Sequence, residues 1–163
     1  GPFLLETSNV KLSNGYTVNT IPDFSNIPSE QKERCRQWID ALRSGEYRQQ
    51  TGALKVPEGF CCLGVACDVA RKNGFGKWRE FKKVSVYADE TGESNVVLTK
   101  GVQDFFGILG PDGFRITLSP PGLEDSRTWR LVDLNDGKIA SFTEISNIIE
   151  IAINGGLNVA SVS

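Results

Sequence analysis

Residues 60–70 read FCCLGVACDVA, and this stretch decides the fold. No polar side chain occurs between Phe60 and Cys67, a pattern typical of a helix that is buried on all sides rather than on one face. Gly64 permits another segment to pack closely against it. The pair Asn73-Gly74 ends the apolar run. The sequence therefore predicts a buried helix that the remaining elements must cover.

The segment before it predicts an amphipathic helix from Ser29 to about Ser44. Ser29 can cap its start, and Gly45 can end it. Its apolar residues follow the spacing i, i+3, i+4 and i+7, which places them on one stripe of a helix. The residues of this stripe are Cys35, Trp38, Ile39 and Leu42.

Capping signals predict two more helices in the C-terminal half. Thr99 can cap a short helix that carries Val102, Phe105 and Phe106. Ser141 and Glu144 form a capping box, in which each side chain binds the backbone N–H of the other residue. The helix after this box is expected to bury Ile145, Ile148, Ile149 and Ala152.

The N-terminal residues predict a β-hairpin. Val10–Leu12 and Tyr16–Val18 flank Asn14-Gly15, a pair that adopts the positive φ of tight hairpin turns. We therefore divide the chain into a hairpin and linker at residues 1–28 and one domain at residues 29–163. The first residues, Gly1-Pro2, are interpreted as the remnant of a removed tag.

Short strand candidates lie between the helices. Val84–Tyr87 and Asn95–Leu98 flank residues 90–93 and predict a second hairpin. Further candidates are residues 53–56, Phe114–Leu118 and residues 129–134, the last followed by a turn at 135–137. The elements show no regular β-α-β alternation. The sequence thus predicts an α+β fold, with about three helices packed on short antiparallel strands.

Composition excludes several kinds of chemistry. The chain has 163 residues, with 18 Lys and Arg, 20 Asp and Glu, and no histidine. The lack of histidine excludes Ser-His-Asp and Cys-His catalysis and His-ligated zinc. No apolar run is long enough to cross a membrane, and no secretion signal is seen. We predict reduced cysteines, no catalytic residue, no metal ligand and no cofactor.

Three stretches of the chain together resemble one family. They are Trp38–Tyr47, Phe60–Asp68, and Leu134–Asp136 followed by Phe142–Ile145. Their order and spacing are similar to those of small, functionally uncharacterised proteins encoded by tailed bacteriophages and prophages, over residues 29–153. The Cys-Cys-Leu-Gly-Val string is the specific part. The resemblance implies a virus-related accessory protein in the host bacterial cytoplasm, and it transfers no activity to named residues.

Cys61 and Cys62, at a predicted helix start, are the sharpest chemical feature. A helix N-terminus favours the thiolate, and some cysteine hydrolases place their nucleophile there. Such enzymes need a histidine base, which the chain lacks, and Asp68 would be a poor substitute. We favour the alternative that Cys61, Cys62 and Cys67 are small buried hydrophobic residues.

Residues 71–83 contain six cations, one anion and three aromatic residues. Cations that bind phosphate and rings that stack on bases are what single-stranded nucleic acid requires. In the alternative that we favour, Phe75, Trp78 and Phe81 form a core face and the cations are solvated, because the whole chain is acidic. The candidate binding residues are Arg71, Lys72, Lys77, Trp78, Arg79, Lys82 and Lys83.

Metal binding is disfavoured. The cysteines contain no Cys-x₂-Cys pair, which opposes zinc. Asp133, Asn135, Asp136 and Glu144 have part of the spacing of a calcium loop, but apolar residues fill the positions between them. A β-turn before a capped helix explains the same residues.

Three function hypotheses follow. The first is a non-enzymatic phage-type accessory protein that binds a host protein or sequesters a small phosphate-bearing ligand, without contact to a membrane. The second is a nucleic-acid-binding protein that uses a basic aromatic loop at residues 71–83. The third is a cysteine-dependent hydrolase-like protein centred on Cys61 or Cys62. Residues 30–83 hold 12 basic and 7 acidic side chains, so we expect the working face to include the loop Gly74–Lys83, with Trp78 as its anchor.

Overall fold

Residues 60–70 contribute most of helix α2 (Cys62–Lys72) in the computed structural model, which describes residues 10–159. Every residue from Cys62 to Ala70 is buried. A Cβ atom at Gly64 would lie 1.7 Å from the carbonyl oxygen of Leu54, so only glycine allows the backbone to cross the helix here. The predicted buried helix and its close packing at Gly64 are confirmed. It starts later than expected, because Gly59–Phe60 form strand β4.

Helix α1 (Ser29–Arg43) confirms the predicted amphipathic helix, and all four residues of its apolar stripe are buried. The cap differs from the expectation. Pro28 occupies the N-cap position, Ser29 is the first helical residue, and no side chain caps the helix. Proline has a fixed φ that suits a helix start, so the helix begins without a hydroxyl cap.

The two capping signals in the C-terminal half are confirmed. The Thr99 hydroxyl accepts a hydrogen bond from the backbone N–H of Val102 at the start of α3 (Lys100–Phe106). Ser141 and Glu144 form the predicted capping box of α5 (Phe142–Ile153). The four residues expected in the core of α5 are buried.

The predicted strand at residues 129–134 is wrong beyond Arg130. Strand β9 (Arg127–Arg130) ends there, and residues 131–136 form helix α4 (Leu131–Asp136), so residues 135 and 136 of the expected turn belong to a helix. Arg130 and Asp133 cap this helix: the Arg130 backbone N–H and guanidinium both donate to the Asp133 carboxylate. Leu131 and Leu134 are buried at a helical spacing, which the alternation starting at Trp129 concealed.

The predicted N-terminal hairpin is present as β1 (Val10–Lys11) and β2 (Thr17–Ile21). Strand β2 also pairs with β8 (Arg115–Ser119) and with β10 (Leu157–Asn158). The hairpin is therefore part of the main antiparallel sheet, whose order is β1-β2-β8-β9.

Two smaller antiparallel sheets complete the fold. Strand β3 (Lys55–Val56) pairs with β4, as the candidate at residues 53–56 anticipated. The other sheet contains β5 (Lys77–Phe81), β6 (Val84–Asp89) and β7 (Gly92–Ser94). Two expectations are corrected here. Residues 77–81, expected in a loop, form a strand, and residues 95–98, expected in a strand, do not.

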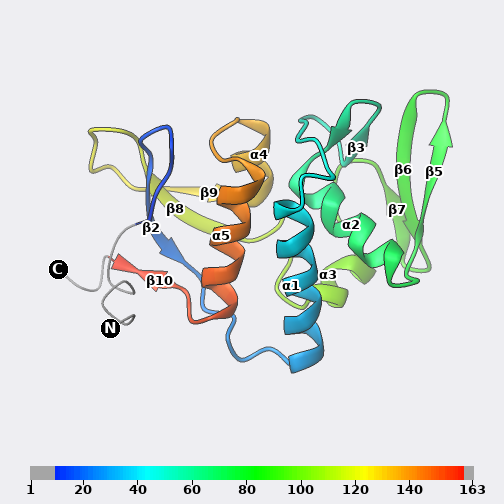
Figure 1. The fold of residues 1–163 in the computed structure, drawn as a ribbon, viewed down its shortest axis with the longest axis horizontal. Coiled ribbons are helices and arrows are strands. Elements are labelled where there is room, and N and C mark those ends of the chain that lie inside the picture. The colour runs from blue at the N-terminus through cyan, green and yellow to red at the C-terminus, as the bar shows by residue number, and fades with distance from the viewer. Residues whose placement is uncertain (1–9, 160–163) are drawn as a thin grey trace.

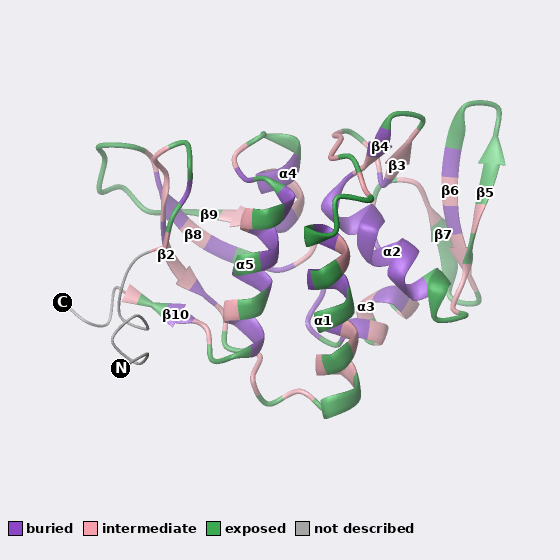
Figure 2. Ribbon diagram, viewed as in Figure 1, coloured by how far each residue is buried: buried purple, intermediate pink, exposed green. Residues whose placement is uncertain are grey.

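The elements lie in a row (Figure 1). The main sheet occupies one end, helices α5, α1 and α2 follow across the middle, and the β5–β6–β7 sheet stands at the other end. Figure 2 shows that α2 is buried along most of its length, whereas much of the β5–β6 hairpin is exposed. Between residues 10 and 159, no helix is both long and apolar enough to span a bilayer. The expected α+β fold is confirmed, with five helices in the described residues.

Candidate functional site

The β5–β6 hairpin has two faces of different character. Side chains alternate along a strand, so Lys77, Arg79 and Phe81 share one face, while Trp78 and Glu80 point to the other. All three residues of the first set are exposed. We call this first face of the hairpin, completed by Val84, Val86 and Ala88 from the paired strand, the outer face. It is a solvent-facing surface with two cations and an aromatic ring.

Trp78 lies on the inner face and is held in place by the core. Its indole N–H donates to Asp68 over 2.9 Å. Its ring makes edge contacts with Phe60 and Tyr87, at centroid distances of 6.1 and 5.6 Å. Tyr87 is completely buried. Trp78 thus joins the hairpin to the body of the protein, so its side chain is not part of the exposed face that it was expected to anchor.

The Asp68 carboxylate accepts the hydrogen bond that holds the hairpin against the body of the protein. Besides the Trp78 indole, it accepts hydrogen bonds from the Tyr47 hydroxyl at 2.5 Å and from Arg71 Nε at 2.7 Å. Burial alone would raise the pKa of Asp68, but the hydrogen bonds from Arg71, Tyr47 and Trp78 outweigh it and lower the pKa below its usual value. A charged Asp68 therefore ties α2 to β5 and to the segment after α1.

The tip of the hairpin combines apolar and basic side chains. The last strand pair, Phe81 and Val84, is 50% and 46% exposed. The turn between them is Lys82-Lys83, and Lys82 has a φ of +58°. Such a backbone conformation favours glycine or asparagine and costs a lysine about 1–3 kcal/mol. The guanidinium of Arg79 lies 5.1 Å from the centre of the Phe81 ring.

The structure separates the seven predicted binding residues into two groups. Four of them, Lys77, Arg79, Lys82 and Lys83, lie on the outer face or the tip of the hairpin. The other three lie on the opposite side of β5 or on α2: Trp78 and Arg71 are bound to Asp68, and Lys72 lies over the Tyr47 ring.

The alternative of a single core face is wrong for Phe81. In a strand, residues three apart point to opposite faces, so Phe81 lies on the exposed outer face while Trp78 is on the inner face. Sequence reasoning did not include Phe81 and Val84 among the binding candidates. The sequence does contain a signal for an exposed hairpin tip, since these two apolar residues flank the two lysines of a turn.

The four cysteines are free thiols and all are buried. Burial raises the pKa of Cys61 to about 11 and that of Cys35 to about 12. It also raises the pKa values of Cys62 and Cys67 well above normal. At neutral pH these groups are therefore thiols, whereas a nucleophile must be a thiolate. The geometry supports the interpretation of Cys61, Cys62 and Cys67 as small packing residues.

The residues whose spacing resembles part of a calcium loop make hydrogen bonds within the fold. Asp133 binds Arg130, which lowers the pKa of its carboxyl group. Asn135 is buried, and its side-chain oxygen accepts from the Cys62 backbone N–H and from the Gln49 side chain. Glu144 takes part in the α5 cap. Within residues 10–159, no group of three or more histidine, cysteine or acidic residues is arranged to hold a metal ion.

Two of the three stretches that carried the family resemblance meet at Asn135. Its side chain bridges the start of α2, through the Cys62 N–H, and the segment after Tyr47, through Gln49. Gln49 in turn accepts a hydrogen bond from the Phe142 N–H at the start of α5. This network satisfies its own donors and acceptors, so these stretches have a structural role that requires no ligand.

Fold and surface together define an α+β domain with a basic hairpin fastened to a buried helix. The chain belongs to the family described as a domain of unknown function, DUF8296, whose model matches residues 30–153. No curated protein and no solved structure matches the chain. The matched range includes the whole of the hairpin.

Proposed function

We propose that this protein is a non-enzymatic binding protein that holds single-stranded nucleic acid on the outer face and tip of its β5–β6 hairpin. One observation carries the proposal: Lys77, Arg79 and Phe81 alternate on one exposed strand face. The tip extends this face with Lys82 and Lys83. Cations and an aromatic ring are thus presented together on one paired strand.

Each kind of side chain supplies a separate part of the affinity. Lys77 and the two tip lysines neutralise phosphates and release their counterions. An exposed ring such as Phe81 gains about 1–3 kcal/mol by stacking on a base. Arg79 also forms an ion pair of 3.6 Å with Glu93, but both side chains are about half exposed. Such surface pairs contribute about 0–1 kcal/mol, so Arg79 can turn to a phosphate at small cost.

The exposed ring also distinguishes between partners. In a duplex the bases are stacked on one another, and their faces are closed to Phe81. A single strand offers both phosphates and open base faces, so it matches the cations and the ring at the same time. An acidic host protein would match the cations alone, and it is the competing outcome of the test below.

We also propose where the protein acts. The sequence resemblance to phage and prophage proteins supports an accessory role in the cytoplasm of a host bacterium. The buried thiols and the lack of histidine support binding over cysteine-dependent hydrolysis.

Fluorescence anisotropy with a labelled poly-dT strand of about 15 nucleotides tests the proposal. We expect binding that weakens steeply with salt. Replacing both tip lysines, K82E and K83E, removes about two phosphate contacts and lowers the slope of log K against log salt by about 1.4. The variant F81S is expected to weaken binding about tenfold without changing this slope.

Matched control variants use the other end of the molecule. The pair K11E and K138E reverses two exposed lysines outside the hairpin, and L123S removes an apolar side chain that is 59% exposed. These variants should bind as the unmodified protein does. The proposal is overturned if no strand binds at the lowest salt, if duplex binds as well as single strand, or if the hairpin variants and controls behave alike. Salt-sensitive capture of an acidic protein without affinity for nucleic acid would overturn it in favour of the competing partner.

A further inference from the structure

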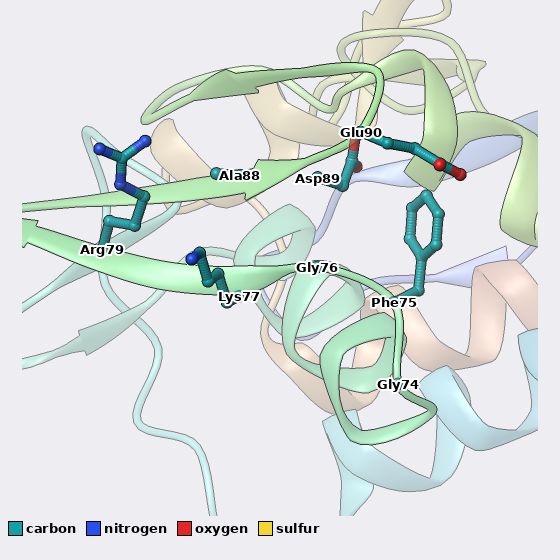
Figure 3. A pocket seen from close by; sticks show the side chains of 8 residues that line it. All are labelled: Gly74, Phe75, Gly76, Lys77, Arg79, Ala88, Asp89 and Glu90. Atoms are coloured by element: carbon teal, nitrogen blue, oxygen red, sulfur yellow. The ribbon is translucent and has the colours of Figure 1, made fainter.

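An open cavity of about 620 Å³ lies at the base of the outer face (Figure 3). Its volume falls within the range of about 300–1,000 Å³ that small-molecule sites occupy. Residues 74–76 form one side of it and the start of β5 another. A Cβ atom at Gly74 would meet nothing within 4 Å, so open space adjoins the cavity on this side.

The walls of this cavity carry three kinds of chemistry. Lys77 and Arg79 line it and extend from the same side of β5 (Figure 3). The Phe75 ring forms an apolar wall and is held in a fixed position, stacked on Phe105 with ring centres 6.1 Å apart. Asp89 and Glu90 line the cavity at the end of β6.

The two carboxylates differ in their availability. One Asp89 oxygen accepts hydrogen bonds from the Thr91 backbone N–H and hydroxyl, and the other accepts from the Thr99 hydroxyl. Asp89 therefore has a structural role. Glu90 is exposed and forms no hydrogen bond or ion pair among the described residues. In Figure 3 its side chain extends to the same end of the cavity as the Phe75 ring, and its carboxylate offers two open acceptors.

We propose that this cavity holds one guanine nucleotide of the bound strand, an inference that rests on the proposed function. The phosphate lies against Lys77 and Arg79, and the base lies against Phe75 with its Watson–Crick edge towards Glu90. Guanine presents two adjacent N–H donors on this edge, which match the two oxygens of a carboxylate. Adenine and cytosine place an acceptor beside their donor, and thymine flanks its donor with two carbonyl groups. An ionised carboxylate repels these acceptors.

Labelled strands of about 15 nucleotides with repeating TTG, TTA and TTC sequences, together with poly-dT, test this inference by anisotropy. We expect the TTG strand to bind about tenfold more tightly than the other three, the discrimination typical of one bidentate contact to a base. The variant E90Q should lose the preference for TTG, because an amide presents one donor and one acceptor and no longer matches two adjacent N–H donors. The variant E124Q changes an exposed carboxylate between β8 and β9, at the opposite end of the molecule (Figure 1), and should keep the preference.

The outcomes separate this inference from the proposed function. Equal affinity of the unmodified protein for all four strands overturns the guanine site and leaves strand binding in place. A preference for TTG that persists in E90Q overturns the assignment to Glu90. Loss of all binding in E90Q with an unchanged melting temperature also contradicts it, because Glu90 is assigned to base selection alone. Absence of binding by the unmodified protein overturns both proposals.

Discussion

The indole N–H of Trp78 donates a 2.9 Å hydrogen bond to the carboxylate of Asp68, and this contact joins the exposed hairpin to the buried helix α2. Asp68 is 6% exposed and receives two further hydrogen bonds, from Tyr47 and Arg71. Helix α2, strand β5 and the segment after α1 thus meet at one carboxylate. The orientation of the outer face follows from this contact, because Trp78 and Lys77 are neighbours on the same strand.

Replacing Asp68 with alanine is expected to lower the free energy of unfolding by about 2–4 kcal/mol, because three donors lose their acceptor in a buried site. Urea denaturation measures this loss. The control is D40A, which removes an exposed aspartate from α1 and should change stability by less than about 0.5 kcal/mol. Equal stabilities of D68A and D40A would contradict the role assigned to Asp68.

The free energy of unfolding should decrease at acidic pH, in part because Asp68 becomes protonated. Its pKa is lowered in the folded state, whereas the unfolded value is about 3.9. Between these two pKa values the folded state therefore binds fewer protons than the unfolded state. The stability that the ionised Asp68 carboxylate contributes is lost as the pH falls from the unfolded pKa towards the folded one. We expect the difference in unfolding free energy between the unmodified protein and D68N to narrow from about pH 5 to about pH 3. A difference that stays constant over this range would refute the expectation.

The thiols should resist alkylation in the folded protein. Burial raises the pKa of Cys61 to about 11, so only a trace of thiolate exists at neutral pH, and Cys62 and Cys67 are completely buried. Mass spectrometry after iodoacetamide treatment at pH 7 should show little labelling, and addition of denaturant should expose all four sites. Rapid labelling of Cys61 in the native protein would revive the cysteine-enzyme hypothesis.

Replacing Gly64 with alanine should destabilise the protein, although alanine is favoured over glycine in helices by about 1 kcal/mol. The new Cβ atom would lie 1.7 Å from the Leu54 carbonyl oxygen, and the backbone there must move. We expect a loss of more than about 3 kcal/mol, measured by thermal or urea unfolding. The control is G110A, whose Cβ atom would meet its nearest neighbour at an ordinary 3.5 Å. A variant G64A as stable as G110A would show that this crossing is not tight.

The sequence by itself determined the helical core. The apolar stripe of α1 and the uninterrupted run at residues 60–67 are local patterns, and burial follows from them because each helix must cover its apolar surface. The caps at Thr99 and Ser141 are equally local, since a cap needs only residues three positions apart. These elements can be predicted without knowledge of contacts between residues that are distant in the sequence.

Local patterns were misleading where a distant partner decides the structure. Trp129 and Leu131 indicated a strand that continues to residue 134, but the core accepts Leu131 and Leu134 from one side of a helix. Residues 77–81 lack the apolar alternation of a strand and form one because β6 supplies the pairing and Asp68 holds Trp78. Strand β2 likewise finds its place in the main sheet only through β8 and β10.

The sequence predicted the segment that contains the candidate site but not which of its side chains share a surface. Composition identified the basic aromatic segment at residues 71–83, because charge and aromatic content are countable without a fold. Tertiary structure decided which of these side chains share a surface: it sets Lys77, Arg79 and Phe81 on the exposed face and fastens Trp78 and Arg71 to Asp68. It also brings Glu90, far along the chain from Phe75, to the same cavity. The physical reason is that strand pairing and a buried carboxylate fix directions in space, and residue spacing in a sequence carries no such direction.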